Sequence, residues 1–170
     1  ALLTTDPRLT NELDDVLRFT LKEKEAIELE HLLVAQVNMP QEFIKLVEYQ
    51  LTPCRACIGC VNTNRCVNTQ DDGILLAEKV KEADALIIAC YTPYSSIDSL
   101  TKSFIERLYP LRHKHGFMAG KPGGAIVTCA IPATNKALPP ACDMAINAIM
   151  FYMMEEGMNF VGAVKILGNV

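Results

Sequence analysis

The sequence lacks several features that would assign it to a common functional class. No apolar run approaches the roughly 20 residues that a membrane-spanning helix requires, so we expect no such segment within it. No dense run of lysine and arginine occurs, and the segment RHKH at 112–115 is more typical of a solvated helix end than of a nucleic-acid-binding stripe. There is no Walker loop, no G-x-G-x-x-G motif and no Ser/His/Asp set. These patterns of nucleotide-binding and hydrolytic enzymes therefore do not apply.

The remaining composition is that of an ordinary globular protein. Of the 170 residues, 50% are hydrophobic and 21% are charged, and the formal net charge is -4. This length predicts one domain over residues 1–170. The N-terminus does not show the pattern of a secretory signal peptide, so we expect a cytoplasmic protein. Cysteines in that compartment stay reduced, and clustered ones are more often metal ligands or redox centres than disulfides.

Short apolar segments alternate with helical patterns along the chain. The predicted strands are near-continuously apolar, which is typical of strands covered on both faces in a parallel sheet. They cover residues 31–37, 85–91, 124–130 and 160–167. The predicted helices cover residues 6–25, 71–84, 96–111 and 139–157.

This alternation predicts right-handed βαβ units and an α/β fold. We predict a flavodoxin-like three-layer sandwich with a parallel sheet and a cysteine-rich insert, residues 50–69, after the second strand. The first strand is expected to be short or truncated, because only Ala1 to Leu3 precede the first helical pattern. In this class, the loops after the carboxyl ends of the strands form the ligand crevice.

Four cysteines with the spacing C-x2-C-x2-C-x5-C are the strongest chemical signal. They are Cys54, Cys57, Cys60 and Cys66. Structural zinc normally uses two ligand pairs separated by a longer stretch, whereas successive x2 spacings resemble the compact runs that hold a cubane iron–sulfur cluster. Gly59 permits close backbone approach to sulfur, and Arg55 and Arg65 carry charge that offsets four thiolates. An iron–sulfur cluster is favoured, and zinc or free redox-active thiols are the alternatives.

A second segment carries a family resemblance together with these cysteines. Residues 90–108, CYTPYSSIDSLTKSFIERL, are similar to the strand-end loop and following helix of the iron–sulfur flavoproteins, within the NADPH-dependent FMN reductase-like proteins. The matching positions include Ser99, Lys102, Phe104, Ile105 and Arg107. The resemblance implies one 4Fe–4S cluster and one FMN per chain, in a homo-oligomer of two or four subunits. It also implies a ferredoxin-like or NAD(P)H electron donor, with no nucleic-acid or membrane partner.

The same resemblance implies where FMN is held. A phosphate loop matches residues 4–12, although Asp6 stands where the family has a small hydroxyl residue. The loop after the third strand reads YTPY with its proline displaced, and Pro132 interrupts a loop that is usually rich in glycine. The residues expected to contact FMN are Arg8, Thr10, Asn11, Tyr91, Thr92, Pro93, Tyr94, Ser95, Ser96, Thr128 and Cys129.

The sequence therefore predicts a redox flavoprotein that passes electrons between the cluster and FMN, an electron carrier or reductase. No side chain is assigned an acid–base role, because the cofactors carry the chemistry. None of His31, His113 and His115 is assigned to catalysis. The altered loops leave open a non-enzymatic iron–sulfur relay subunit that has lost FMN, and a zinc-stabilised binding domain is a further alternative. Cys90 and Cys129 are predicted to be buried as small hydrophobic side chains, and Cys142, on the last helix, is predicted to lie in the core or in a subunit interface.

Overall fold

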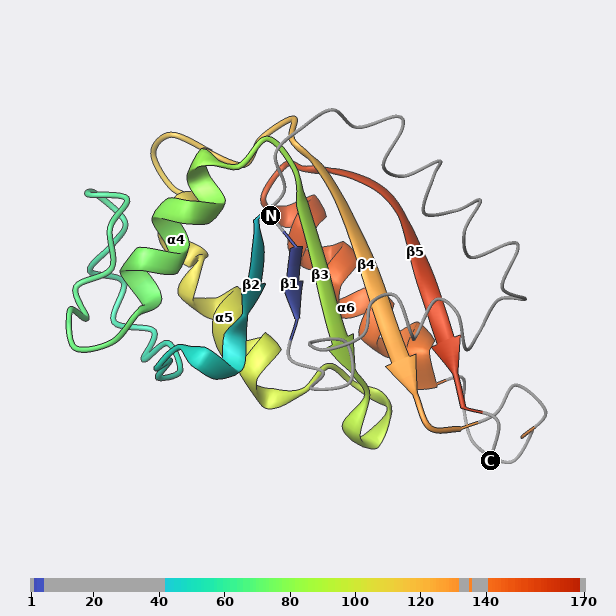
Figure 1. The fold of residues 1–170 in the computed structure, drawn as a ribbon. Helices are drawn as coiled ribbons and strands as arrows, with labels where there is room; N and C mark the ends of the chain where they lie inside the picture. Colours follow the sequence, from blue (N-terminus) through green and yellow to red (C-terminus); the bar gives the residue numbers. More distant parts are fainter. Residues whose placement is uncertain (1, 5–41, 132–134, 136–140, 169–170) are drawn as a thin grey trace.

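A single parallel sheet forms the centre of the computed structural model, which describes residues 2–4, 42–131, 135 and 141–168. Its strands are β1 Leu2–Thr4, β2 Phe43–Lys45, β3 Leu86–Tyr91, β4 Pro122–Cys129 and β5 Asn159–Leu167. The strand order is β2-β1-β3-β4-β5, and every neighbouring pair is parallel (Figure 1). This is the flavodoxin-like order, in which β2 lies on one side of β1 and the later strands β3, β4 and β5 are added on its other side. The predicted fold class is confirmed.

Three of the predicted strands are confirmed as β3, β4 and β5. Their apolar residues alternate between the two faces, and on the face toward the helices Leu86, Ile88 and Cys90 of β3 are fully buried. The strand predicted at 31–37 lies outside the described residues. Within the described residues, the strand β2 precedes the cysteines; the sequence does not predict it, because three residues are too few to show a pattern. The first strand is short, as predicted.

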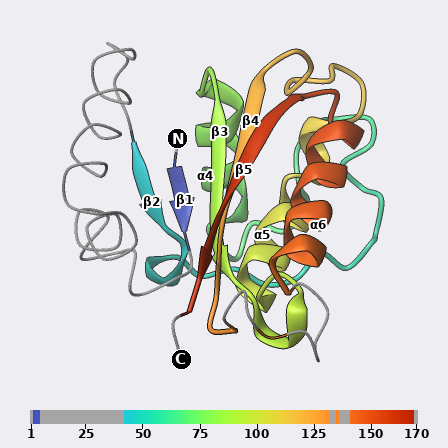
Figure 2. The same cartoon turned by 90° about the vertical axis from the view of Figure 1, so that its right-hand side faces the viewer.

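The three described helices are α4 Gly73–Glu82, α5 Ser99–Arg107 and α6 Ala141–Glu155. They cover the same face of the sheet, as right-handed crossovers that all progress in one direction require (Figures 1 and 2). Single turns of 3-10 helix lie at η1 Leu46–Glu48, η2 Pro93–Ser95 and η3 Tyr109–Leu111. Among the residues that the structure describes, no helix is long and apolar enough to cross a membrane.

The helix boundaries follow local chemistry. Asp98 caps α5, because its Oδ1 accepts hydrogen bonds from the N–H groups of Leu100 and Thr101. The predicted helix over 96–111 ends at Arg107, because Pro110 has no N–H to donate and restricts the residue before it. The chain continues as η3 and brings residues 109–113 beside the cysteine-rich segment.

The core lies between the sheet and these helices. Each helix contributes fully buried apolar side chains, and the largest include Leu76 of α4, Phe104 of α5, and Ile149 and Met153 of α6. The predicted burial of Cys90 and Cys129 is confirmed, and Cys142 lies in the core, because each of the three side chains is at most 6% exposed. The three therefore behave as small hydrophobic residues within this core.

Candidate functional site

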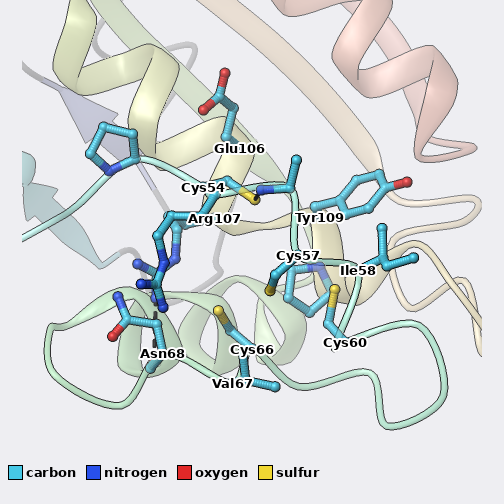
Figure 3. Close-up of a pocket in the computed structure, with 14 residues that line it drawn as sticks. Cys54, Cys57, Ile58, Cys60, Cys66, Val67, Asn68, Glu106, Arg107 and Tyr109 are labelled. Carbon is cyan, nitrogen blue, oxygen red and sulfur yellow. Dashed lines mark hydrogen bonds between the residues drawn. The ribbon is translucent and has the colours of Figure 1, made fainter.

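The four cysteines of the predicted cluster site line one pocket. The segment between β2 and α4 carries them past the last turn of α5, and Glu106, Arg107, Tyr109 and Pro110 form the opposite wall. Figure 3 shows the sulfur atoms of Cys57, Cys60 and Cys66 directed toward a common space, with Cys54 above them in that view. The structure thus brings together all four residues that the spacing singled out.

The backbone of this loop adopts conformations that are rare for residues with side chains. Ala56 and Ile58 both have φ of 51°, and Asn64 has φ of 53°, in the left-handed region. The Ala56 N–H donates to Cys54 Sγ at 3.4 Å. Left-handed residues turn successive N–H groups toward a common concave side, an arrangement found around anions and iron–sulfur centres. The loop backbone therefore supplies at least one donor, the Ala56 N–H, to a cysteine sulfur atom.

Gly59 lies close to another part of this loop. A Cβ atom at this position would lie 2.8 Å from Cγ1 of Val67 and 3.8 Å from Sγ of Cys57. The first distance is shorter than normal van der Waals contact, so a side chain here would force the exposed side chain of Val67 to move. The glycine thus allows the segments that carry Cys57 and Cys66 to approach each other closely.

The thiols influence one another electrostatically. Burial raises the pKa of Cys60, and the charges of Cys66, Cys54 and Cys57 raise it further. All four cysteines are free of disulfides. Four thiolates at this proximity repel one another unless a cation lies among them. This donor set suits a soft metal centre.

The donor set fits an iron–sulfur cluster. Four thiolates on one continuous loop match the four corners of a cubane, which is larger than a single ion. Within the described part of the chain, no group of three or more His, Cys, Asp or Glu side chains is arranged to hold one metal ion. The assignment of Cys54, Cys57, Cys60 and Cys66 as cluster ligands stays a prediction.

A buried ion pair fastens both ends of the cysteine-rich segment to α5. Arg107 Nη1 and Nη2 donate to the two carboxylate oxygens of Asp71 at 2.6 and 2.8 Å, and the side chains are only 2% and 3% exposed. Nη1 also donates to the Thr52 carbonyl at 3.1 Å, and Nη2 reaches the Asn68 carbonyl at 3.5 Å. Thr52 and Asn68 flank the four cysteines. One guanidinium group therefore holds the two ends of the cysteine-rich segment together.

Asp71 completes this closure from the other side. Its Oδ2 accepts hydrogen bonds from the Thr52 N–H at 2.9 Å and from Asn68 Nδ2 at 3.1 Å. Burial alone raises the pKa of Asp71, but hydrogen bonds from Thr52 and Arg107 outweigh it and hold that pKa well below its usual range. The carboxylate therefore stays charged opposite Arg107 at neutral pH.

Sequence reasoning missed this pair. The sequence places Asp71 at the start of a helix over 71–84, and its Oδ1 does accept a hydrogen bond at 3.1 Å from the N–H of Gly73, where α4 begins. Both carboxylate oxygens also accept hydrogen bonds from Arg107, which the sequence did not indicate. The signal was present in α5, because Arg107 occupies the apolar face between Phe104 and Leu111. A charged residue in a buried stripe requires a buried partner. His113, to which no role was assigned, lies 3.6 Å from Cys60 Sγ through its Nε2.

The second predicted site lies at the carboxyl edge of the sheet. Because all strands are parallel, the ends of β1, β3 and β4 meet at this edge, beside the reversal of strand order. Thr92 Oγ1 donates to the Thr128 carbonyl at 3.2 Å and ties the loop that follows β3 to the carboxyl end of β4.

The loop after β3 carries local strain and an exposed aromatic side chain. Tyr94 has φ of 52° and Ser95 has φ of 64°, both left-handed. A residue other than glycine in this conformation raises the free energy of the folded state, and such strained residues are often found at ligand-binding sites. Tyr94 is fully exposed and Tyr91 is 41% exposed. These rings are available to a planar ligand.

Other residues predicted to contact FMN have different placements. Cys129 is buried, and its Sγ accepts a hydrogen bond from the Ile131 N–H at 3.3 Å, so its sulfur serves the chain itself. Arg8, Thr10 and Asn11 lie outside the described residues, and so do Asp6 and Pro132, at which the loops depart from the family's pattern. The assignment of Arg8, Thr10, Asn11 and the other predicted contact residues to FMN stays a prediction.

Comparison with known proteins agrees with this class of fold and site. Residues 6–150 match the family model of the NADPH-dependent FMN reductases. An iron–sulfur flavoprotein of Methanocaldococcus jannaschii is 32% identical over 98 residues, which cover 57% of this chain and 49% of the relative. An iron–sulfur flavoprotein of Archaeoglobus fulgidus is 33% identical over 89 residues, covering 52% of this chain and 40% of the relative. The crystal structure of RosB aligns over 98% of this chain and 64% of RosB, with a TM-score of 0.68 and 15% identity, and shows the fold.

The protein is a flavodoxin-like α/β protein of the flavin-binding oxidoreductase class. More particularly, the chain belongs to the NADPH-dependent FMN reductase family, with iron–sulfur flavoproteins as its relatives at modest identity. The family resemblance carried by the cysteines and by residues 90–108 is therefore confirmed. The chain spans half or less of the length of these two relatives.

Proposed function

We propose that this protein passes electrons between a 4Fe–4S cluster, held by Cys54, Cys57, Cys60 and Cys66, and an FMN at the carboxyl edge of the sheet. The observation that carries the proposal is the convergence of all four thiols on one pocket in a loop closed by a buried ion pair. Iron–sulfur relatives support the cluster, and the family supports FMN. When bound, the cluster supplies single-electron transfer and FMN supplies one- or two-electron chemistry.

The residues of the chain hold and separate the two centres. The cysteine thiolates supply the ligands, and Ala56 N–H donates to one of them. Arg107 and Asp71 keep the loop in place through the change of charge on reduction, because their bonds do not involve the sulfur atoms. At the other site, Tyr91, Tyr94 and the hydroxyl groups of Thr92, Ser95 and Ser96 bind and orient FMN. No side chain is required to move a proton.

The two proposed cofactor sites lie at opposite ends of α5. α5 begins beside the loop proposed to bind FMN and ends at the cysteine pocket, and its nine residues span about 13 Å at 1.5 Å per residue. Figure 1 shows the cysteine-rich loop at the flank beyond α4, away from η2. Ile58 and Val67 belong to this loop and line the pocket, and their exposed fractions are 68% and 55%. We propose a homo-oligomer, dimer or tetramer, in which a second copy covers these side chains and brings its FMN near the cluster.

The donor is proposed to be a cytoplasmic ferredoxin-like protein or NAD(P)H. The exposed guanidinium of Arg55 beside the pocket suits an acidic protein donor. Stopped-flow measurements with each donor distinguish the two. The rate of reduction by a ferredoxin-like protein falls as the salt concentration rises, whereas the rate of reduction by NAD(P)H is less affected. A reductase turns over with a terminal acceptor, and a carrier only exchanges electrons.

The first test is a cofactor measurement on protein purified without oxygen. Iron, sulfide and flavin are quantified, and the visible spectrum is recorded before and after dithionite. We expect about four iron atoms and one FMN per chain, with absorption near 400 nm that bleaches on reduction. A cluster without flavin, even after incubation with FMN, would identify a relay subunit instead. Zinc without visible absorption would identify a structural zinc site, and either result refutes the two-cofactor function.

The oligomer is tested by mixing two inactive variants. Cys57→Ser lacks the cluster, and Tyr94→Ala with Tyr91→Ala weakens the flavin site. If electrons pass between subunits, mixed oligomers regain cluster-to-flavin transfer that neither variant shows alone. No recovery in verified mixed oligomers would restrict transfer to a single chain.

A further inference from the structure

One histidine outside the cysteine motif faces the predicted cluster site. His113 Nε2 lies 3.6 Å from Cys60 Sγ, within hydrogen-bonding distance for sulfur. Cys60 is 8% exposed, whereas Cys57 is exposed. The histidine therefore meets the thiol that has the least access to water.

The position of His113 is fixed from two directions. Its ring packs edge-on against Tyr109 of η3, with centroids 4.5 Å apart and planes at 88°. The facing loop is anchored to the same turn, because Asn64 Nδ2 donates to the Pro110 carbonyl at 2.8 Å. The Asn64 N–H in turn donates to the Cys60 carbonyl at 2.9 Å. The contact is thus held by the fold on both sides.

On the basis of the proposed cluster, we propose that His113 is a positioning residue that donates its Nε2–H to Cys60 Sγ. A donor aimed at a ligating thiolate orients the ligand and stabilises negative charge on it. Reduction adds negative charge to the cluster, so this hydrogen bond raises the reduction potential. It also slows the loss of iron, because the sulfur is held in its ligating position.

Direct ligation by His113 is the competing geometry. A thiolate and an imidazole on one tetrahedral zinc ion are also separated by about 3.6 Å, given bonds of about 2.3 and 2.0 Å. The donor role is favoured because four thiolates already satisfy the four corners of a cubane. A fifth protein ligand has no corner to occupy.

Three variants test the proposal. His113→Phe keeps a ring against Tyr109 and removes the donor, whereas His113→Gln places an amide N–H at similar reach. The matched control is His115→Phe, because His115 lies two residues away, is exposed and contacts Phe117 with centroids 5.2 Å apart. Each protein is purified without oxygen, and its secondary structure is compared with wild type by circular dichroism. Iron and sulfide content, midpoint potential and the rate of iron loss to a chelator are then measured.

We expect His113→Phe to keep its iron content, to show a lower midpoint potential and to lose iron roughly tenfold faster than wild type. His113→Gln restores both properties at least in part, and His115→Phe matches wild type. Unchanged potential and iron loss in His113→Phe would overturn the proposal. The proposal would also be overturned if His113→Phe bound fewer iron atoms per chain than wild type, or if the protein bound zinc in a way that depended on His113. Either result would make the imidazole a metal ligand. Wild-type protein without iron and sulfide would instead refute the proposed function on which this inference rests.

Discussion

The loop that carries the cysteines and the loop that follows β3 differ in how they are held. The cysteine-rich loop is tied to α5 and η3 by buried or part-buried contacts of Arg107, Asp71 and Asn64. The loop after β3 contains two left-handed residues, and Tyr94 points fully into solvent. The comparison teaches that one site is built from the chain's own polar contacts, whereas the other leaves its surface for a ligand to cover.

The largest effect is expected from removing a thiol. Cys57→Ser should eliminate the cluster, because serine oxygen is a poor ligand for iron–sulfur clusters, while bound FMN should remain near one per chain. Cys142→Ala is the matched control, because Cys142 is buried on α6, away from the loop. Iron, sulfide and flavin assays check this. If Cys57→Ser also lost all FMN, the two regions would not be independent.

The buried ion pair gives the next largest effect. Arg107→Met leaves the Asp71 carboxylate buried without its partner and should cost about 3–5 kcal/mol in the free energy of unfolding. Lys102→Gln on the same helix is the control. Lys102 makes an exposed pair with Glu106 at 3.4 Å, and its loss should cost no more than about 0.5 kcal/mol. Urea denaturation of the cluster-free protein provides the measurement, and equal effects of the two variants would contradict the role of Arg107.

A pH series separates a paired buried carboxylate from an unpaired one. The folded pKa of Asp71 is depressed, so its contribution to stability is present above about pH 4 and is lost as the pH falls further. Asp71→Asn should therefore be less stable than wild type by about 1–3 kcal/mol at pH 7, and the difference should narrow below pH 4. Denaturation curves between pH 3 and 8 test this. A difference that stays constant with pH would show that the charge of Asp71 is not involved.

The contribution of Glu156 to stability should change with pH in the direction opposite to that of Asp71. It is buried, and its Oε2 has no hydrogen-bond partner among the described residues. Burial raises its pKa from 4.5 to about 7, with a smaller opposing effect of Arg112. The folded pKa is raised, so stability is lost as the pH rises from about 4.5 to 7. Glu156→Gln should be more stable than wild type by roughly 1–3 kcal/mol at pH 8 and equal to it near pH 4. If the wild-type protein were as stable as Glu156→Gln at pH 8, or more stable, this prediction would be wrong.

The smallest effect on stability is expected in the loop after β3. Tyr94→Asn suits the left-handed backbone and removes an exposed ring, so the free energy of unfolding should stay within about 0.5 kcal/mol of wild type. The FMN dissociation constant should rise severalfold, because the ring no longer covers the flavin. Fluorescence titration with FMN and thermal denaturation check the two parts. Unchanged FMN affinity would remove Tyr94 from the proposed site.

The fold class and the candidate cluster ligands can both be predicted from the amino-acid sequence alone. Apolar strands at 85–91, 124–130 and 160–167 alternate with amphipathic helices, and local periodicity is enough to read them. The four cysteines lie within 13 residues, so their proximity follows from chain connectivity. Both signals are local, and neither requires knowledge of distant contacts.

The residues that hold and surround the candidate cluster site become apparent in the folded structure. Arg107 and Asp71 are 36 residues apart, and His113 and Cys60 are 53 apart. Their contacts arise because α5 and η3 pack against the loop before α4, which no periodic pattern reveals. β2 was likewise invisible, because a three-residue strand acquires its structure from pairing with β1. Long-range contacts of this kind are specified by packing of the whole domain, since each partner alone is an ordinary polar residue.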